Sequence, residues 1–522
     1  MLKIISNLNL REKEKYFFIS TFVIITLSIL TNSIVDTNGF LTNDSTHFLK
    51  LAKSFSLNND LHVYSWTNSG EINFFSMWPL GYPLLISFIS DLTFLDVFWS
   101  SKLLNILSVL VVFLMIYKQT PFGYSLIALL FLFGSFINIF SYTITENLFM
   151  VGLVSYAYTS HNLSTNSNKK NMLLAFLSFA IAFSSRYIGG YLLVFNFFLI
   201  LKSIKNGSRG TRNLIILLIA SGIYMIAYLY MNKYFTGSLT YPHAYLTYES
   251  ATEIILHFIK KVLEELNLIM ASVRFSASPL FSIISSFISG IFISLVCLYC
   301  SRAKVKDSSL NTLGNNFVNL SLFYLIVVFA WRLTIWFSPF SYRILFPASI
   351  LMMIGFAYKI LSRTNLNLDG IKAIYLTLVL IGFLSIGYNV VYKQVSFEGI
   401  SYSENVKRIN KKYNEIDGGG AIIFGERQVD YLRTDLIPLK PYYLPLFEKT
   451  ESLKEINRRI AKFDLLYFNI PEICQKPYRT LSGDRGLNCI STEKKIHSFD
   501  NKILDYIKEN KKLGLHRIRE IR

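Results

Sequence analysis

Cysteine is scarce in this chain, with four residues in 522. Cys297 and Cys300 fall inside a hydrophobic run, where neither solvent nor a helix N-terminus would activate a thiol, so we interpret them as packing residues. No spacing of cysteine and histidine resembles a zinc site. The sequence therefore indicates neither thiol redox chemistry nor structural zinc.

Acidic residues are also few, because 33 Asp and Glu stand against 52 Lys and Arg, a formal net charge of +19. Such a balance can indicate a nucleic-acid partner. Here, however, the basic residues cluster in short loops between hydrophobic runs, as the positive-inside rule requires of membrane proteins. We therefore predict no nucleic-acid partner.

Hydrophobic residues make up 52% of the chain, and the mean hydropathy is +0.40. A soluble protein of this length could not hide so much apolar surface, since single cores stop growing near 250–300 residues. Runs of about 20 apolar residues, the length that crosses a bilayer, recur along the chain. These features predict an all-α polytopic membrane protein.

About eleven membrane spans are predicted. They lie near residues 16–34, 97–117, 121–140, 145–160, 171–186, 187–204, 213–231, 280–300, 317–337, 343–361 and 370–392. The basic N-terminal flank has no small-residue cleavage site after it, so we expect it to be retained. Residues 83–92 are too few to cross and read as an interfacial or re-entrant helix.

Charge in the loops predicts the orientation. We expect the protein in the plasma (inner) membrane. Alternation of the spans then places on the cytoplasmic side the basic loops around Lys118, Lys169, Arg212, Arg302 and Lys359. The opposite loops hold Asp44, Glu146, Arg186, His243 and Arg343. An odd number of spans then leaves the C-terminus outside.

Two domains are predicted: a transmembrane domain over 1–394 with a large first outer loop at 35–82, and a small extracytoplasmic α/β domain over 395–522. In the second, helices are expected at 403–414, 451–462 and 498–511, and strands at 421–425 and 464–470. The glycines at 418–420 precede a strand, which is the wrong order for a phosphate loop. Cys474 and Cys489 fall in this outer domain, where a disulfide is expected.

Polar residues at the outer ends of spans form a possible site. Asp44 and His47 are three apart and would share a helix face. Glu146, Arg186 and Arg343 each lie at the outer end of a span. Two carboxylates and two arginines at one membrane depth could meet in one cavity, and the arginine fork suits a phosphate.

Each of these residues also has a simpler explanation. An arginine at a span end can be an interfacial anchor, and Glu146 at a helix start can be favoured by the helix dipole alone. Asp44 could be an N-cap, and His47 could be structural. Trp78 and Tyr82 could be ordinary interface aromatics.

The first outer loop resembles that of the GT-C glycosyltransferases. The resemblance lies in Asp44-Ser45, His47, Leu49, Ala52 and the distant run Trp78-Pro79-Leu80-Gly81-Tyr82-Pro83-Leu84-Leu85. The bacterial relatives of the dolichyl-phosphate-mannose protein mannosyltransferases and of the lipid A aminoarabinose transferase are the most similar group. Thr145-Glu146-Asn147-Leu148-Phe149, Ser185-Arg186-Tyr187 and Tyr342-Arg343-Ile344-Leu345-Phe346-Pro347 also resemble family landmarks. Asn43 stands where eukaryotic-type members have a further acidic residue, so a second carboxylate either comes from elsewhere, Glu146 being the candidate, or is not needed.

The resemblance implies transfer of one sugar, with inversion, from a polyprenyl-phosphate donor to a hydroxyl of an extracytoplasmic glycan, lipid or protein. It makes Asp44 the base, with Glu146 and His47 as orienting residues. The lipid phosphate and sugar would contact a set of residues from several loops: Arg186, Arg343, Tyr187, Trp78, Tyr82, Lys50 and His243. A divalent metal stays open, since one Asp and one Glu could hold an ion or none.

Three other functions fit the same composition. A transporter or flippase of lipid-linked sugars would also need basic groups near a lipid phosphate, but it would place ionisable residues near mid-membrane. An oligosaccharide polymerase or ligase is a second alternative. A sensor whose outer domain binds a partner is a third.

Overall fold

The computed structural model describes most of the first 364 residues and parts of the remainder. The described residues are 10–64, 72–166, 168–207, 210–240, 249–268, 279–334, 340–364, 387, 400–414, 416, 418–419, 421–423, 428–439, 466–469 and 515–517. The chain divides into two compact units. The first, which we call the bundle unit, comprises Met1–Phe40, Ser76–Leu85 and Phe98–Gly399, and the second, the mixed unit, comprises Leu41–Phe75, Ile86–Val97 and Ile400–Arg522.

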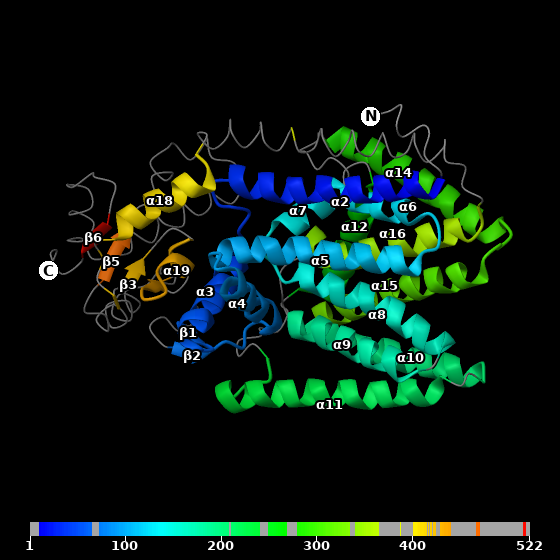
Figure 1. The fold of residues 1–522 in the computed structure, drawn as a ribbon, viewed down its shortest axis with the longest axis horizontal. Coiled ribbons are helices and arrows are strands. Elements are labelled where there is room, and N and C mark those ends of the chain that lie inside the picture. The colour runs from blue at the N-terminus through cyan, green and yellow to red at the C-terminus, as the bar shows by residue number, and fades with distance from the viewer. Residues whose placement is uncertain are drawn as a thin grey trace. The chain divides into compact units, whose positions relative to one another are not determined.

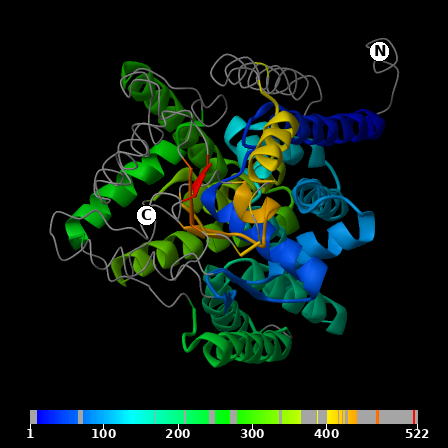
Figure 2. The same cartoon turned by 90° about the vertical axis from the view of Figure 1, so that its left-hand side faces the viewer.

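The bundle unit is made of helices, which run side by side in Figures 1 and 2. In chain order they are α2 (Leu10–Val35), α5 (Val97–Gln119), α6 (Tyr124–Leu129), η1 (Leu130–Leu132), α7 (Gly134–Ser141), α8 (Glu146–Thr165), α9 (Lys169–Ser185), η2 (Tyr187–Gly190), α10 (Tyr191–Lys205), α11 (Thr211–Thr236), α12 (Ala251–Glu265), α14 (Pro279–Arg302), α15 (Ser308–Thr334) and α16 (Tyr342–Leu361). Helix α4 (Gly81–Thr93) begins in this unit, and its 13 residues are too few to cross a bilayer, as predicted for 83–92.

The protein is an integral membrane protein. Seven helices of the described residues are long and apolar enough to span a membrane, or eight if the bent pair α6–η1 and α7 is one span. Helix α9 has 17 residues and α8 is rich in polar side chains, so neither is among the seven, and the predicted span at 370–392 lies outside the described residues. The count of eleven therefore stays a prediction.

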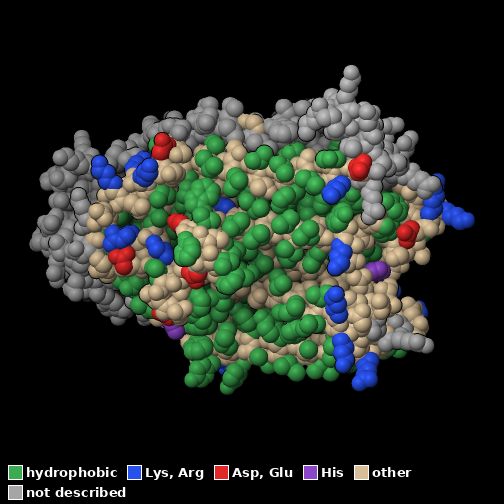
Figure 3. Space-filling view, viewed as in Figure 1, with side chains coloured by type: hydrophobic (Ala, Val, Ile, Leu, Met, Phe, Trp, Pro, Cys, Tyr) green, Lys and Arg blue, Asp and Glu red, His purple; other side chains and the backbone are tan. Residues whose placement is uncertain are grey.

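The surface of the bundle unit is largely apolar. Only 17% of the hydrophobic window of α11 and 11% of that of α14 is buried within the protein, as expected of helices that face lipid. Figure 3 shows hydrophobic side chains spread broadly over the visible helices, with a row of Lys and Arg side chains toward the right-hand side.

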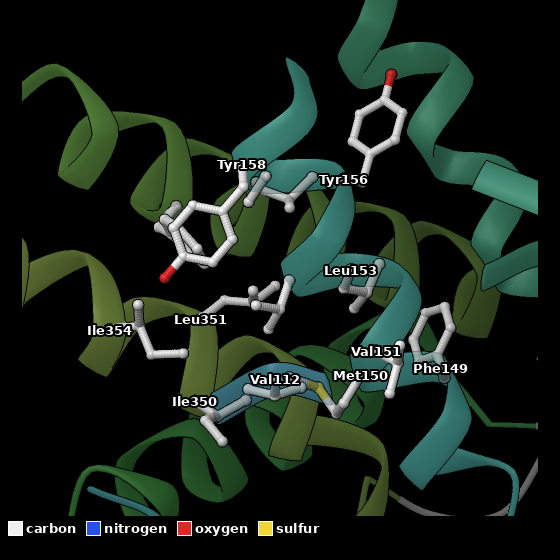
Figure 4. Packing of buried hydrophobic residues seen from close by; sticks show 14 of the residues in the cluster. Val112, Phe149, Met150, Val151, Leu153, Tyr156, Tyr158, Ile350, Leu351 and Ile354 are labelled. Atoms are coloured by element: carbon white, nitrogen blue, oxygen red, sulfur yellow. The ribbon is translucent and has the colours of Figure 1, made fainter. Parts of the chain in front are cut away.

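The core of the bundle unit holds interlocking aliphatic and aromatic side chains. Met150 of α8 lies beside Val112 of α5, which lies next to Ile350 of α16 (Figure 4). Small residues allow a close helix contact, because a Cβ at Gly152 would lie 2.7 Å from the backbone nitrogen of Ala182 in α9. Helices α8 and α9 therefore hold a fixed spacing at the end of the bundle where Glu146 lies.

The mixed unit combines two helices of the first loop with a small sheet. It contains α3 (Asn43–Asn58), the antiparallel strands β1 (His62–Tyr64) and β2 (Ile72–Phe74), most of α4, α18 (Tyr402–Tyr413) and α19 (Val429–Leu432). The sheet has the order β4-β3-β5-β6, from Ile437–Leu439, Ala421–Ile423, Leu466–Asn469 and Leu515–Arg517. Strand β3 pairs in parallel with β4 and β5, and β6 is antiparallel to β5.

These elements agree with the predicted helix at 403–414 and the predicted strands at 421–425 and 464–470. Strands β4 and β6 were not predicted. The helices expected at 451–462 and 498–511 lie outside the described residues, so this part of the predicted C-terminal domain stays a prediction, as do the domain boundaries.

Candidate active site

Glu146 is the first residue of α8, and its side chain has no exposed surface. Helix α7 ends at Ser141, and a short turn leads through Thr145 into α8, which places Glu146 at the start of that helix. A carboxylate at this position suits the positive end of the helix dipole. The dipole alone does not explain full burial, however, since a charge that leaves water needs a counter-charge.

Two arginines supply that counter-charge. Arg343, in the first turn of α16, approaches Glu146 with both Nε and Nη2, the second at 3.4 Å from Oε2. Arg186, between α9 and η2, places Nη1 at 2.5 Å from Oε1. Nη1 of Arg186 is close enough for an ion pair, but its N–H bonds are not aligned for a hydrogen bond. We call these three residues the arginine clamp.

All three residues of the clamp belong to the bundle unit, and the two arginines are partly open to solvent. The side chains of Arg186 and Arg343 are 23% and 24% exposed, whereas that of Glu146 is 0% exposed. Two cations and one anion leave a formal charge of +1. The partly exposed arginines can therefore attract an anion from solvent, whereas the buried carboxylate of Glu146 does not contact solvent.

Tyr187 connects the clamp to the motif at Trp78. Its hydroxyl donates to the carbonyl of Ser76 at 2.8 Å and accepts from Asn232 Nδ2 at 2.8 Å. The Leu80 amide donates to the hydroxyl of Tyr228 at 2.7 Å. These bonds fix residues 76–80 against α11 and against Tyr187, the residue that follows Arg186.

The end of the Trp78 motif is tightly packed. A Cβ at Gly81 would lie 2.6 Å from the backbone oxygen of Ser184, which explains glycine at this position. Trp78 is half-buried. Tyr82 is fully buried, and its hydroxyl donates to Asn105 Oδ1 at 3.0 Å. Its hydroxyl therefore makes a bond within the protein interior.

In the mixed unit, Asp44 and His47 lie on the first turns of α3, as their spacing predicted. The N-cap of this helix is Thr42, whose side chain accepts from the Ser45 amide in a capping box. The explanation of Asp44 as an N-cap is therefore wrong. Asp44 is half-buried, and His47 is 8% exposed.

Helix α3 also contacts α19, in the C-terminal part of the chain. Thr46 Oγ1 lies 3.2 Å from Oδ2 of the buried Asp430 in α19, and Lys53 Nζ donates to the carbonyl of Leu432 at 2.7 Å. Lys50 is 2% exposed, and its ammonium lies 5.2 Å from the centre of the Tyr64 ring, a cation–π contact. The helix that carries Asp44 is thus held by contacts with α19.

The sequence-predicted residues fall into three groups. Glu146, Arg186 and Arg343 are brought together in the bundle unit, where Tyr187, Trp78 and Tyr82 also lie. Asp44, His47 and Lys50 share α3 in the mixed unit. His243, Cys474 and Cys489 lie outside the described residues. Among the residues that are described, no group of three His, Cys, Asp or Glu is placed to hold a metal ion.

Sequence reasoning missed several buried charged residues, among them Lys102 in α5, Arg332 in α15 and Asp430. Lys102 Nζ donates to the carbonyl of Ser141 at 2.7 Å, and Arg332 Nη2 donates to Glu249 Oε2 at 2.5 Å. A signal was present for the first two, because a charge inside a hydrophobic run is rare and costly. Asp430 carried no such signal.

No family model matches the sequence, and no curated protein matches it. Solved structures do match the fold. The crystal structure of ArnT from Cupriavidus metallidurans bound to undecaprenyl phosphate aligns with a TM-score of 0.51 at 11% identity, covering 90% of this chain and 94% of that one.

Two weaker similarities are with other GT-C proteins. The archaeal oligosaccharyltransferase AglB from Archaeoglobus fulgidus, in complex with an inhibitory peptide and a dolichol-phosphate, aligns with a TM-score of 0.45 at 11% identity over 87% of this chain and 69% of that one. The S. cerevisiae protein O-mannosyltransferase Pmt1-Pmt2 complex bound to the sugar donor gives 0.32 at 15% identity over 44% and 34%. The match to ArnT, over nearly both chains, confirms the predicted GT-C-like fold.

Proposed function

We propose that this protein, with its GT-C fold, is a membrane glycosyltransferase. It transfers one sugar from a polyprenyl-phosphate donor to a hydroxyl of an extracytoplasmic glycan, lipid or protein, with inversion. The observation that carries the proposal is the arginine clamp, a preformed site of net positive charge at the ends of the spans. The similar fold of a protein bound to undecaprenyl phosphate supports a lipid phosphate as its ligand.

The two arginines differ in what they can offer the phosphate. Arg343 uses Nε and Nη2 on Glu146, so that contact fixes the plane of its guanidinium. Arg186 contacts a single oxygen of Glu146 and lacks hydrogen-bond alignment at Nη1. We therefore assign the lipid phosphate first to Arg186, with Arg343 as a fixed second charge. Held in place before the reaction, these charges stabilise the departing phosphate without reorganising.

The two carboxylates have different tasks. Glu146 is fully buried and paired, so it orients the arginines and cannot serve as a base for a bulky acceptor. Asp44 is half-buried on the first turn of α3 and is not needed as a cap. It is the carboxylate suited to take the acceptor's proton, a step that typically contributes about 10²–10⁴-fold.

The reaction then has one displacement. The acceptor oxygen forms a bond to the anomeric carbon as the bond from that carbon to the phosphate oxygen breaks. The proton of the acceptor passes to Asp44, and the polyprenyl phosphate leaves with its negative charge on the oxygen facing the arginines. Attack from the face opposite the leaving group inverts the anomeric centre. His47, three residues from Asp44, is assigned an orienting role.

The proposed location follows from the basic loops. The N-terminus is placed in the cytoplasm, and the clamp, Asp44 and the C-terminal domain are placed on the outer side of the plasma membrane. Donors that carry sugars on a polyprenyl phosphate would be presented to the clamp by the outer leaflet.

The test combines an in vitro and a cellular measurement. Purified protein is incubated with polyprenyl-phosphate sugars extracted from the host, and released polyprenyl phosphate is measured by mass spectrometry. Surface glycans, lipids and proteins of a deletion strain are compared with those of the parent. We expect lipid phosphate release that depends on Arg186 and Glu146, and loss of one sugar in the deletion strain.

A matched control is Glu264→Gln, which changes an exposed carboxylate on α12 paired only with Lys261 at 2.5 Å. This variant should keep full activity. Movement of the intact donor across vesicles without release of lipid phosphate would contradict the proposal and indicate a flippase. Loss of a whole oligosaccharide in the deletion strain would indicate a polymerase or ligase.

A further inference from the structure

Lys102 is a fully buried lysine near the start of α5, and the reaction proposed above does not use it. Its ammonium donates to the carbonyl of Ser141 at 2.7 Å and lies 5.0 Å from the centre of the Phe98 ring. Ser141 is the last residue of α7, and the last carbonyls of a helix have no partner within it. A cation there meets the negative end of the helix dipole.

Two neighbours on α5 bind the same short segment. Asn105 Nδ2 donates to the carbonyls of Phe140 at 2.9 Å and Tyr142 at 2.8 Å. The hydroxyls of Ser101 and Thr143 lie 2.8 Å apart. Residues 101, 102 and 105 fall within about one turn of helix, so one face of α5 binds every residue of 140–143.

That segment leads directly to Glu146. The Ile144 amide donates to Tyr142 at 3.1 Å, and Asn147 Nδ2 donates to the same carbonyl at 3.0 Å. A shift of 140–143 would therefore move the first turn of α8 and, with it, the carboxylate between Arg186 and Arg343. The hydrogen bonds that join α5 to residues 140–143 go to backbone carbonyls and to one hydroxyl, so they fix the position of this segment.

We infer that Lys102, with Ser101 and Asn105, is a positioning residue that sets the arginine clamp by fixing the turn from α7 into Glu146. The inference rests on the proposed function, since the clamp is its target. Nζ of Lys102 neutralises the end of α7, and Asn105 and Ser101 fix the direction in which the chain leaves it. Glu146 then meets both arginines without adjusting its own backbone.

The test is a double-mutant cycle with Lys102→Met and Glu146→Gln, each studied alone and together. Methionine keeps the length of the buried side chain but donates nothing to Ser141. Binding of undecaprenyl phosphate to purified, monodisperse protein is the first readout. We expect K102M to weaken binding on the order of tenfold in the wild-type background. In the E146Q background the same change should alter binding by less than about twofold, because the group it positions is already lost.

Lys118→Met, at the exposed inner end of α5, is the matched control and should leave binding unchanged. Where K102M does not insert, Ser101→Ala replaces it, with Ser108→Ala as its control, because Ser108 bonds only the Leu104 carbonyl of its own helix at 2.8 Å. S101A should weaken binding severalfold and S108A should not. An equal loss from K102M in both backgrounds, or equal effects of S101A and S108A, overturns the inference.

A second readout needs no ligand and separates this inference from the proposed function. The thermal unfolding temperatures of the four proteins in the cycle are compared in detergent. Positioning through the shared segment predicts that the effects of K102M and E146Q do not add, whereas independent structural effects predict that they do. Wild-type protein that does not bind undecaprenyl phosphate would contradict the proposed function, and the unfolding cycle would still decide for or against Lys102.

Discussion

Removing the arginines of the clamp one at a time should reveal how its stability is built. In Arg186→Met or Arg343→Met, Glu146 keeps one cation, and each change should cost about 1.5–3 kcal/mol, the range for a hydrogen bond to a charged group. In the double variant the carboxylate, 0% exposed, has neither arginine. Removing the second arginine should cost about 3–5 kcal/mol, the range for removing one partner of a buried ion pair and leaving the other charge unpaired. The loss in the double variant therefore exceeds the sum of the losses in the two single variants.

Adding Glu146→Gln to the double variant should restore most of that second loss, because a neutral amide needs no counter-charge. Thermal unfolding of the purified proteins in detergent gives the order of stability: wild type, single variants, triple variant, double variant. Lys261→Met, which breaks an ion pair with the 47%-exposed Glu264 on α12, is the control and should cost less than about 1 kcal/mol. A double variant whose loss equals the sum of the single losses, with no rescue by glutamine, would refute the assignment of Glu146 as a buried charge held by two arginines.

Four further outcomes are expected. Asp44→Asn should lower sugar transfer by about 10²-fold or more without changing the unfolding temperature. Thr42→Ala, which removes the N-cap of α3, should cost about 1 kcal/mol of stability and leave transfer by the folded protein intact. Near wild-type transfer by D44N would contradict the assignment of Asp44 as the base. Cys474 and Cys489 should form a disulfide, and two free thiols in freshly alkylated protein would exclude it. A membrane-impermeant label should reach Cys474, after reduction, only from outside; labelling only from the cytoplasm would contradict the topology. The hydrogen bond from Arg433 lowers the pKa of Asp435, so this pair should stabilise the mixed unit at pH values above about 3.9 and lose its effect as the pH falls through the lowered pKa. The stability difference between wild type and R433M, measured by unfolding at pH 7 and at pH 3, should therefore be smaller at pH 3. An equal difference at both pH values would contradict this prediction.

Much of the bundle unit could be predicted from the sequence because membrane spans are long apolar runs with basic inner flanks. Hydrophobicity along a run does not report where a span breaks, however. The predicted span at 121–140 is in fact two helices at 72° to one another. The break lies at Phe133, between η1 and α7.

Strands β4 and β6 escaped prediction for a different reason. Each has three residues, too few for a period-two pattern to stand out. Their pairing partners are distant in sequence, as Tyr467 with Arg517 illustrates. The register of this sheet is a property of tertiary contacts, which local composition does not encode.

The candidate site shows what residue type and spacing can and cannot establish. Spacing placed Glu146, Arg186 and Arg343 at the ends of spans, and the shared depth led to the expectation that they meet. It could not tell which carboxylate is free to react, because burial is decided by neighbours far along the chain. The structure separates the two: Glu146 has no exposed surface and two arginines, whereas Asp44 is half-buried beside a cap made by Thr42. Since a base must meet its substrate and an orienting residue need not, this difference in exposure supports Asp44 as the proposed base and Glu146 as the proposed orienting residue.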